Sequence, residues 1–180
     1  MNASNMPDKT RPEEWFRDYQ FTSHAINALK ELSTRVDATT GQPQNFAVSL
    51  GFKLPHLAVH MPWKYYEMYR NRQNAFMLSK KELRFPPSTP EVSFRIGERY
   101  FTYMKNEGQE KSEHVEAIGK IDQVIPAQMR LEMQWTYSAA VSFLDTQVGR
   151  LLDTMDELGL WDNTTVILTA DHGMHNVPNK

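Results

Sequence analysis

The sequence contains no cysteine among its 180 residues. This absence excludes disulfide bonds, thiolate metal sites and a cysteine nucleophile from the chain. Long apolar runs are also missing, since no stretch approaches the roughly 20 apolar residues that a membrane-spanning helix needs. The N-terminus lacks the basic and then apolar pattern of a secretory signal peptide. We therefore expect no membrane span and no signal peptide in this chain.

An excess of charge of one sign is absent too, because 20 lysines and arginines face 22 aspartates and glutamates. No basic patch stands out, so the sequence predicts no nucleic-acid partner. Hydrophobic residues make up 40% of the chain, which is compatible with a packed core. A chain of 180 residues is also the usual size of one domain.

A buried strand that ends in polar residues is predicted near the C-terminus. Residues 165–169 are β-branched or apolar, as in a strand covered on both faces of a parallel sheet. Asp171 and His172, two potential metal ligands, follow, and Gly173 then lets the backbone turn. Ligands of open α/β sheets bind beyond the carboxyl ends of strands. The pattern indicates a candidate site, although an ordinary strand with a polar end has the same appearance.

The clearest helix is predicted between Pro126 and Leu158. Proline is favoured at the first helical position, and Gly159 suits the left-handed end of a helix. Gly149 in the interior suggests close approach by a neighbouring element. Apolar residues recur at intervals of three and four, which predicts one buried stripe formed by Val141, Leu144, Val148, Leu151, Met155 and Leu158.

The first third of the chain predicts a helix followed by a strand. Residues 1–17 are polar and are expected to form an exposed lead-in. Thr22 or Ser23 is a candidate N-cap for a helix that continues to Leu32. Residues 46–50 then have the composition of a short buried strand. This order is typical of one half of a parallel α/β unit.

Two histidines follow the strand predicted at residues 46–50. His56 and His60 are four residues apart, and on a helix they would share one face. Pro55 and Pro62 favour a loop instead, so the spacing alone is weak support for a metal site. For His60 we favour a hydrogen-bonded loop residue, and we expect residues 62–69 to form a short helix with aromatic residues that pack.

Residues 71–124 are polar, carry mixed charges and contain a proline-rich stretch. They predict a long surface insertion between core elements. Residues 1–180 together are expected to form a single unit rather than several domains.

Three closely spaced stretches are distinctive when taken together. Residues 137–152 read YSAAVSFLDTQVGRLL, residues 156–160 read DELGL, and residues 163–173 read NTTVILTADHG. This combination resembles the sulfatase family, and VSLGFKLPHL at residues 48–57 resembles a second segment of that family. The resemblance implies an α/β fold, an alkaline-phosphatase-like sandwich with a mostly parallel sheet flanked by helices.

The resemblance also implies a chemistry, the hydrolysis of a sulfate ester. It is strongest to the branch of the family that removes 2-O-sulfate from glycosaminoglycans, with heparan and dermatan sulfate as substrates in the lysosome or outside the cell. By position, His56 would be a catalytic and substrate-binding residue that contacts the sulfate or protonates the leaving oxygen. Asp171 and His172 would lie in the shell of a Ca²⁺ ion. Leu54 stands where the family has a lysine, with Lys53 one residue earlier.

Several family features have no counterpart in the sequence. The family nucleophile is a formylglycine made from a cysteine, and the chain has none. The family's N-terminal aspartate pair is missing as well, and residues after Gly173 depart from the family pattern, so His175 and Lys180 receive no role. The resemblance therefore predicts the internal part of a longer sulfatase catalytic domain, inactive by itself. Asn163 lies in a sequon and is a candidate glycosylation site.

Two alternatives stay open at this point. The first is a truncated relative without catalysis, and an in-frame Cys-x-Pro-x-Arg segment upstream of Met1 would argue against it. The second is another phosphate- or sulfate-ester hydrolase of the alkaline phosphatase superfamily. Such enzymes usually use threonine or serine with zinc and further histidines.

Overall fold

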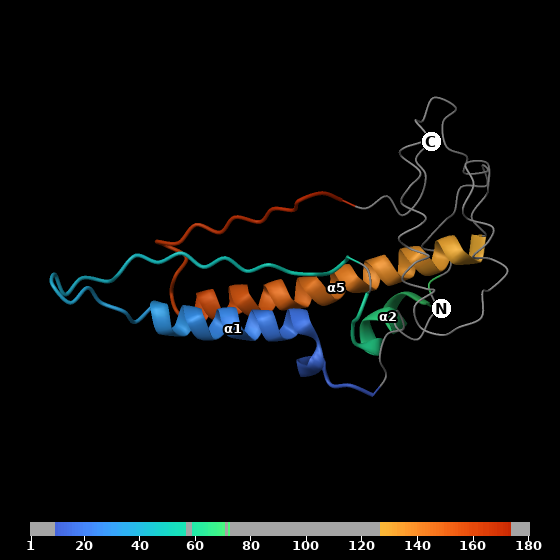
Figure 1. The fold of residues 1–180 in the computed structure, drawn as a ribbon, viewed down its shortest axis with the longest axis horizontal. Coiled ribbons are helices and arrows are strands. Elements are labelled where there is room, and N and C mark those ends of the chain that lie inside the picture. The colour runs from blue at the N-terminus through green and yellow to red at the C-terminus, as the bar shows by residue number, and fades with distance from the viewer. Residues whose placement is uncertain (1–9, 57–58, 71, 73–126, 174–180) are drawn as a thin grey trace, which may run out of the picture.

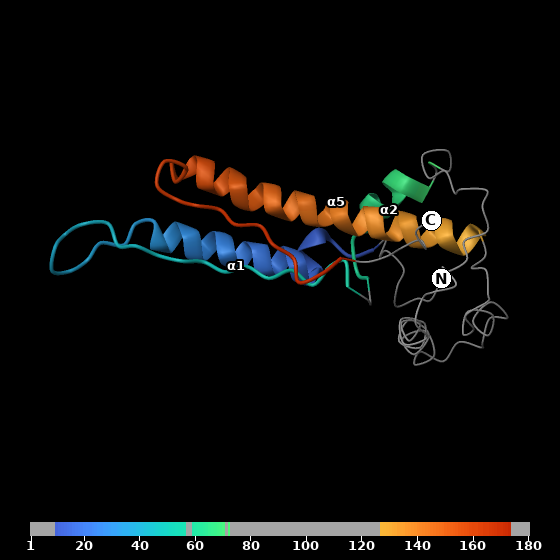
Figure 2. The same cartoon turned by 90° about the horizontal axis from the view of Figure 1, so that it is seen from above.

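The structure, a computed structural model, describes residues 10–56, 59–70, 72 and 127–173. Its helical elements are a short 3-10 helix followed by three α-helices: η2 Glu13–Trp15, α1 Arg17–Leu32, α2 Trp63–Arg70 and α5 Ala127–Glu157. Figures 1 and 2 show α1 and α5 side by side and running in the same direction, with α2 against α5 near the start of α1. No helix in the described part of the chain is long and apolar enough to cross a membrane.

Helix α5 confirms the helix predicted between residues 126 and 158, but its most deeply buried face is centred away from the predicted stripe, of which Met155 is buried. The side chains that pack most tightly include Ala139, Ala140, Phe143, Gln147 and Thr154. At 3.6 residues per turn, this face is about a quarter-turn away from the predicted stripe. Members of that stripe are mostly half-buried, and Val141 is exposed.

The end of α5 follows the sequence prediction closely. Gly159 has a φ of 63°, and the Leu160 N–H donates to the Met155 carbonyl at 3.0 Å. Leu160 is buried beside Met155, so the chain folds back onto the last turn as expected. The expectation for Gly149 is wrong, because among the described residues no neighbouring element comes within 4 Å of a Cβ added there.

Helix α1 begins earlier than predicted. Its first residue is Arg17, and neither Thr22 nor Ser23 is the N-cap. Thr22 is buried inside the helix and its hydroxyl donates to the Asp18 carbonyl at 2.9 Å. Phe16, in the expected exposed lead-in, and Asp18, just after it, are also buried. Packing of these residues extends the helix beyond the position where capping preference alone would start it.

Two clusters form the core between the helices. The larger one joins the start of α1, α2 and the first half of α5. In it the ring of Phe143 lies 5.9 Å from that of Phe16 and 5.1 Å from that of Tyr65, measured between centroids. The smaller cluster contains Leu29 and Met155, and Phe46 packs against it.

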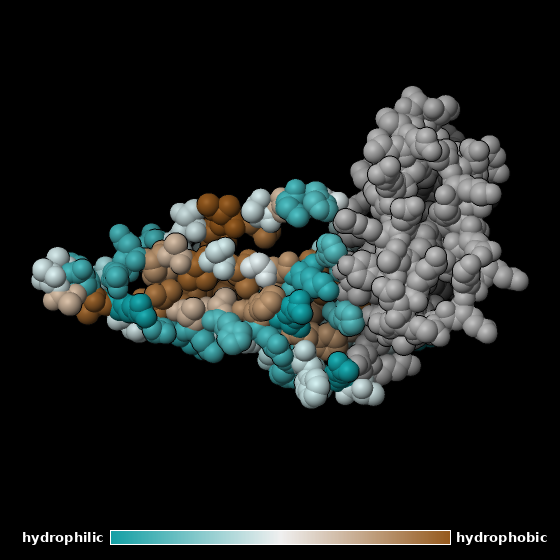
Figure 3. All heavy atoms as spheres, in the orientation of Figure 1, coloured by the Kyte–Doolittle hydropathy of each residue, from teal (hydrophilic) through white to brown (hydrophobic). Residues whose placement is uncertain are grey.

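The strands predicted at residues 46–50 and 165–169 are not formed, and the described residues contain no strand. Both segments run in the same direction along one face of the layer formed by α1 and α5, here called the helix layer (Figures 1 and 2). In Figure 3 open space separates the C-terminal segment from the layer, and Ile167 and Leu168 are each 82% exposed. A strand exists only when its backbone pairs with a neighbour. The prediction of two buried strands is therefore wrong for the described residues, because neither segment is paired and most of their side chains are exposed.

Residues 71–124, predicted to be an insertion, lie outside the described residues apart from Arg72. The division of the chain into lead-in, domain and insertion thus stays a prediction.

Candidate functional site

His56 lies at the end of a tight turn that begins at Lys53. The His56 N–H donates to the Lys53 carbonyl at 3.0 Å, and the peptide bond between Leu54 and Pro55 is cis. The Lys53 N–H donates to the Asp18 Oδ1 atom at 2.7 Å. Leu54 is 5% exposed and belongs to the larger core cluster. The turn is therefore tied to the helix layer, while the side chain of His56 is exposed.

His60 follows in a loop, as the sequence predicted. The described residues near the two histidines form no helix before α2 begins at Trp63. Val59 and Met61 are buried on either side of His60, which is exposed. The two histidines therefore do not share a helix face, and their spacing gives no metal pair.

Asp171 and His172 lie at the end of the C-terminal segment, and both side chains are open to solvent. Their side chains are 89% and 71% exposed. The His172 N–H donates to Asp171 Oδ1 at 2.9 Å, and His172 Nε2 is 3.5 Å from Asp171 Oδ2. The other ring nitrogen, Nδ1, is 3.0 Å from the Gly173 carbonyl oxygen. These contacts join residues that are adjacent in the sequence, so they do not fix the pair to the helix layer.

The tight turn at His56 and the bend at Asp171 each follow an extended segment. In Figures 1 and 2, these two segments run in the same direction along the same face of the helices α1 and α5. Parallel segments with their carboxyl ends at one edge are the arrangement that forms binding sites in α/β proteins. The sequence-predicted site residues thus follow two extended segments that share one face of the helices.

The donor set of this region can be compared with the needs of Ca²⁺, which takes about six to eight oxygen ligands. The carboxylate of Asp171 fits this set, whereas the imidazole of His172 is not a typical calcium ligand. Among the residues that the structure describes, no three His, Asp or Glu side chains come close enough to hold a metal ion. Asp171 and His172 by themselves are therefore too few for such a shell, and a calcium ion bound there would need further ligands.

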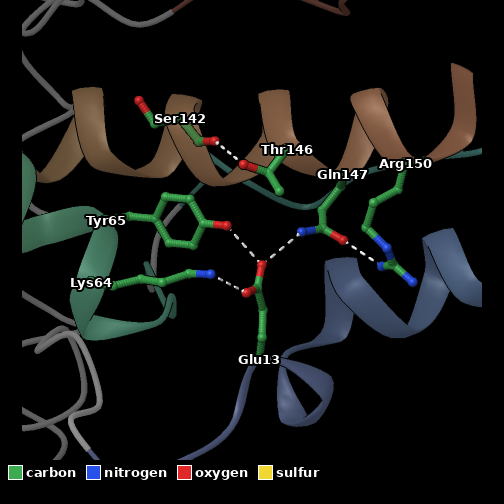
Figure 4. A network of polar contacts seen from close by, with 7 residues as sticks. All are labelled: Glu13, Lys64, Tyr65, Ser142, Thr146, Gln147 and Arg150. Carbon is green, nitrogen blue, oxygen red and sulfur yellow. Dashed lines mark hydrogen bonds and ion pairs between the residues drawn. The ribbon is translucent and has the colours of Figure 1, made fainter. Parts of the chain in front are cut away.

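A partly buried polar network joins the helices beside this region (Figure 4). Glu13 lies at its centre, with Lys64 Nζ 2.5 Å from Glu13 Oε2. Glu13 Oε1 accepts hydrogen bonds from the Tyr65 hydroxyl at 2.7 Å and from Gln147 Nε2 at 3.2 Å. The network joins η2, α2 and α5, three elements that are distant in the sequence.

The network changes the acidity of its members. Burial on its own raises the pKa of Glu13, but hydrogen bonds from Lys64, Tyr65 and Gln147 and the charge of Lys64 outweigh it, so the pKa is lowered. The hydrogen bond to Glu13 raises the pKa of Lys64. Burial raises the pKa of Tyr65, which stays protonated and able to donate.

Arg150 continues this network toward α1. Its guanidinium donates to Gln147 Oε1 at 2.7 Å and to the Ser23 hydroxyl at 2.9 Å. It also lies over the ring of Tyr19, 3.8 Å from the centroid, in a cation–π contact. The polar network and the apolar clusters together fix α1 against α5.

Sequence reasoning missed Glu13 and Asp18, which were placed in or next to an exposed lead-in. Acidic residues are usually on the surface, so composition gave no reason to bury them. One signal was available for the region: Phe16, Tyr19 and Thr22 extend the buried face of α1 at intervals of three. Nothing in the local sequence indicates that Asp18 contacts Lys53.

Comparison with known proteins identifies the class to which this helix layer and candidate site belong. Residues 4–179 match the sulfatase family, so the chain belongs to that family. Members have an alkaline-phosphatase-like α/β fold, of which the described residues form helices and extended segments.

Three individual relatives within this comparison share sequence identity with most of the chain. The chain is 29% identical to human iduronate 2-sulfatase over 162 residues, which is 90% of this chain and 26% of that protein. It is 27% identical to the mouse iduronate 2-sulfatase over 179 residues, 96% of this chain and 27% of that protein. It is also 25% identical over 175 residues to PehA of Trinickia caryophylli, a multifunctional alkaline phosphatase superfamily protein, covering 95% of this chain and 30% of that protein. The chain thus spans about a quarter of the length of the first two relatives.

Proposed function

We propose that the protein is a sulfuric ester hydrolase that removes 2-O-sulfate groups from iduronate in glycosaminoglycans such as heparan and dermatan sulfate. The observation that carries this proposal is the similarity to iduronate 2-sulfatase along 90% of the chain, within a family match over residues 4–179. The exposed Asn163 sequon is consistent with a lysosomal or secreted protein that carries a glycan at this position.

His56 is the residue of this chain that we assign to the reacting ester. An imidazole can act as a general acid or as a hydrogen-bond donor, so it can donate a proton to the leaving alcohol oxygen or hydrogen-bond to the sulfate. Its exposure at the end of a turn held by the core supports this role, because the side chain can reach a ligand while its backbone is fixed.

Asp171, with His172 beside it, is assigned to the calcium shell. A calcium ion bound there would neutralise the sulfate oxygens and orient the ester. The carboxylate is the better matched of the two side chains, and its position beyond an extended segment supports the assignment.

The family's nucleophile is a formylglycine made from cysteine, and these 180 residues contain no cysteine. We therefore propose that this polypeptide by itself does not turn over sulfate esters. The similarity to PehA favours a second candidate, a phosphate- or sulfate-ester hydrolase with broader substrates in the same superfamily.

The test compares the native product of the encoding gene, purified through an appended tag, with the 180-residue polypeptide. We expect the native product to release sulfate from a 2-O-sulfated iduronate disaccharide and the polypeptide to release none. H56A should lower kcat about 100-fold, since general acid–base catalysis contributes at least this much. H60A is the matched control and should keep its activity.

Other outcomes would change the assignment. Hydrolysis of phosphodiesters without release of sulfate would replace the first candidate with the second. A native product without activity toward either ester class would indicate a non-catalytic relative. Turnover by the isolated polypeptide would contradict the requirement for a cysteine-derived nucleophile.

A further inference from the structure

Asp18 is a buried carboxylate in the first turn of α1, with only 3% of its surface exposed. Burying a charged group is costly unless hydrogen bonds compensate for the lost water. Its Oδ1 atom accepts the Lys53 N–H at 2.7 Å, from a residue 35 positions later in the chain. The N-terminal end of a helix also favours a negative charge. One carboxylate oxygen therefore holds the start of the turn that leads to His56.

This turn is restrained at three of its four residues. Its first N–H is bound to Asp18, and the next side chain, Leu54, is buried in the core. The His56 N–H closes the turn on the Lys53 carbonyl at 3.0 Å. With both ends of the turn restrained, the position of the His56 backbone is set relative to α1.

We propose that Asp18 is a positioning residue for the sulfate-ester site. By holding the Lys53 N–H, it fixes the turn so that the imidazole of His56 is presented at the reacting ester oxygen. This inference rests on the function proposed for His56. Asp18 is not assigned any contact with the substrate or with a metal ion.

Two substitutions of Asp18 separate its hydrogen bond from its charge. Asp18→Asn keeps an acceptor atom at the same place and removes the charge, whereas Asp18→Leu removes the acceptor at similar volume. Thr22→Val is the matched control. Thr22 is also buried on α1, and its hydroxyl donates to a backbone carbonyl of the same helix. If Asp18→Leu prevents folding, Asp18→Ser replaces it, since the shorter side chain suits a helix start but does not reach Lys53.

The variants are made in the native gene product, and kcat, KM and amide hydrogen exchange at residues 53–56 are measured. We expect D18L to lower kcat about 10- to 100-fold with little change in KM, because a displacement of about 1 Å can cost about that much. D18N should restore most of the rate, and T22V should leave kcat unchanged. Exchange at the Lys53 amide should become faster in D18L alone.

The outcomes distinguish this inference from the proposed function. Faster exchange at Lys53 in D18L, in a product whose wild type releases no sulfate, would overturn the proposed function and still support the anchor. Wild-type kcat in D18L, or an equal loss of kcat in T22V, would overturn the positioning role and leave the proposed function in place.

Discussion

The two turns that carry the candidate site residues are held in different ways. The turn from Lys53 to His56 is tied to α1 by Asp18 and to the core by Leu54. Asp171 and His172 contact each other and Gly173, and their side chains are largely exposed. Both turns end extended segments on the same face of the helix layer (Figure 1).

This difference indicates which half of the candidate site the described residues can organise by themselves. A side chain on an anchored turn is pre-organised, and little conformational freedom is lost when a ligand binds it. A side chain with local contacts alone gains its position from whatever binds or packs beside it. The His56 turn is therefore expected to be rigid before ligand binding, and the position of the Asp171 side chain is expected to depend on the ligand or segment that packs beside it.

The largest predicted effect is a change in the free energy of unfolding. It is expected when one leucine is truncated in each of the two regions. L54A should lower the free energy of unfolding by about 2 to 5 kcal/mol, because it leaves a cavity in the core. L168A removes an exposed side chain and should change this free energy by less than about 0.5 kcal/mol. Urea denaturation followed by helical circular dichroism measures both. Equal effects would show that the two segments are equally packed.

Removal of Arg150 should have the next largest effect on the layer that supports the His56 turn. R150A loses the contacts with Ser23, Gln147 and the ring of Tyr19, and should destabilise the protein by about 2 kcal/mol. R35A serves as the control, because Arg35 makes an exposed ion pair with Glu31 on α1. Similar unfolding midpoints for the two variants would argue against the network.

The substitution E13Q should cost about 1 kcal/mol at neutral pH, since the partner Lys64 is mostly exposed and solvent screens the pair. The pKa of Glu13 is lower in the folded state than the ordinary value of 4.5 for a glutamate. Its ionised form therefore stabilises the fold above pH 4.5, and this contribution is lost as the pH falls below 4.5 through the folded pKa. The difference between wild type and E13Q should shrink over that acidic range in denaturation experiments. A difference that grows there would contradict the network.

The smallest effect on stability is expected at the other turn. D171N should leave the free energy of unfolding within about 0.5 kcal/mol of wild type, because the side chain is 89% exposed. If Asp171 is a calcium ligand, the same variant should weaken Ca²⁺ binding by the native gene product, as measured by isothermal titration calorimetry. A large loss of stability without calcium present would show that the Asp171 turn is anchored after all.

The sequence predicted helices better than strands for a physical reason. Helix hydrogen bonds join residues four apart, so the periodicity of α5 and the glycine after it were sufficient to place its ends. Strand hydrogen bonds join distant segments, so the composition of residues 165–169 could not supply a partner, and without one the predicted burial is wrong as well. The start of α1 was missed because the packing of Phe16 outweighs the capping preference of Thr22.

Some residues of the candidate site could likewise be predicted from the sequence, and one could not. His56, Asp171 and His172 could be proposed from family resemblance and from their places after extended segments. Asp18 could not, because its contact with Lys53 spans 35 residues and an aspartate is expected at the surface.

The hydrogen bond between Glu13 and Gln147 joins residues that are 134 positions apart. Bringing two such distant points together has an entropic cost of about 4 kcal/mol plus a constant, which grows only with the logarithm of the intervening length. Doubling that length would add about 0.6 kcal/mol. The stretch of chain between α2 and α5 can therefore be lengthened or shortened among related proteins at little thermodynamic cost, while the helices that it connects keep their contacts.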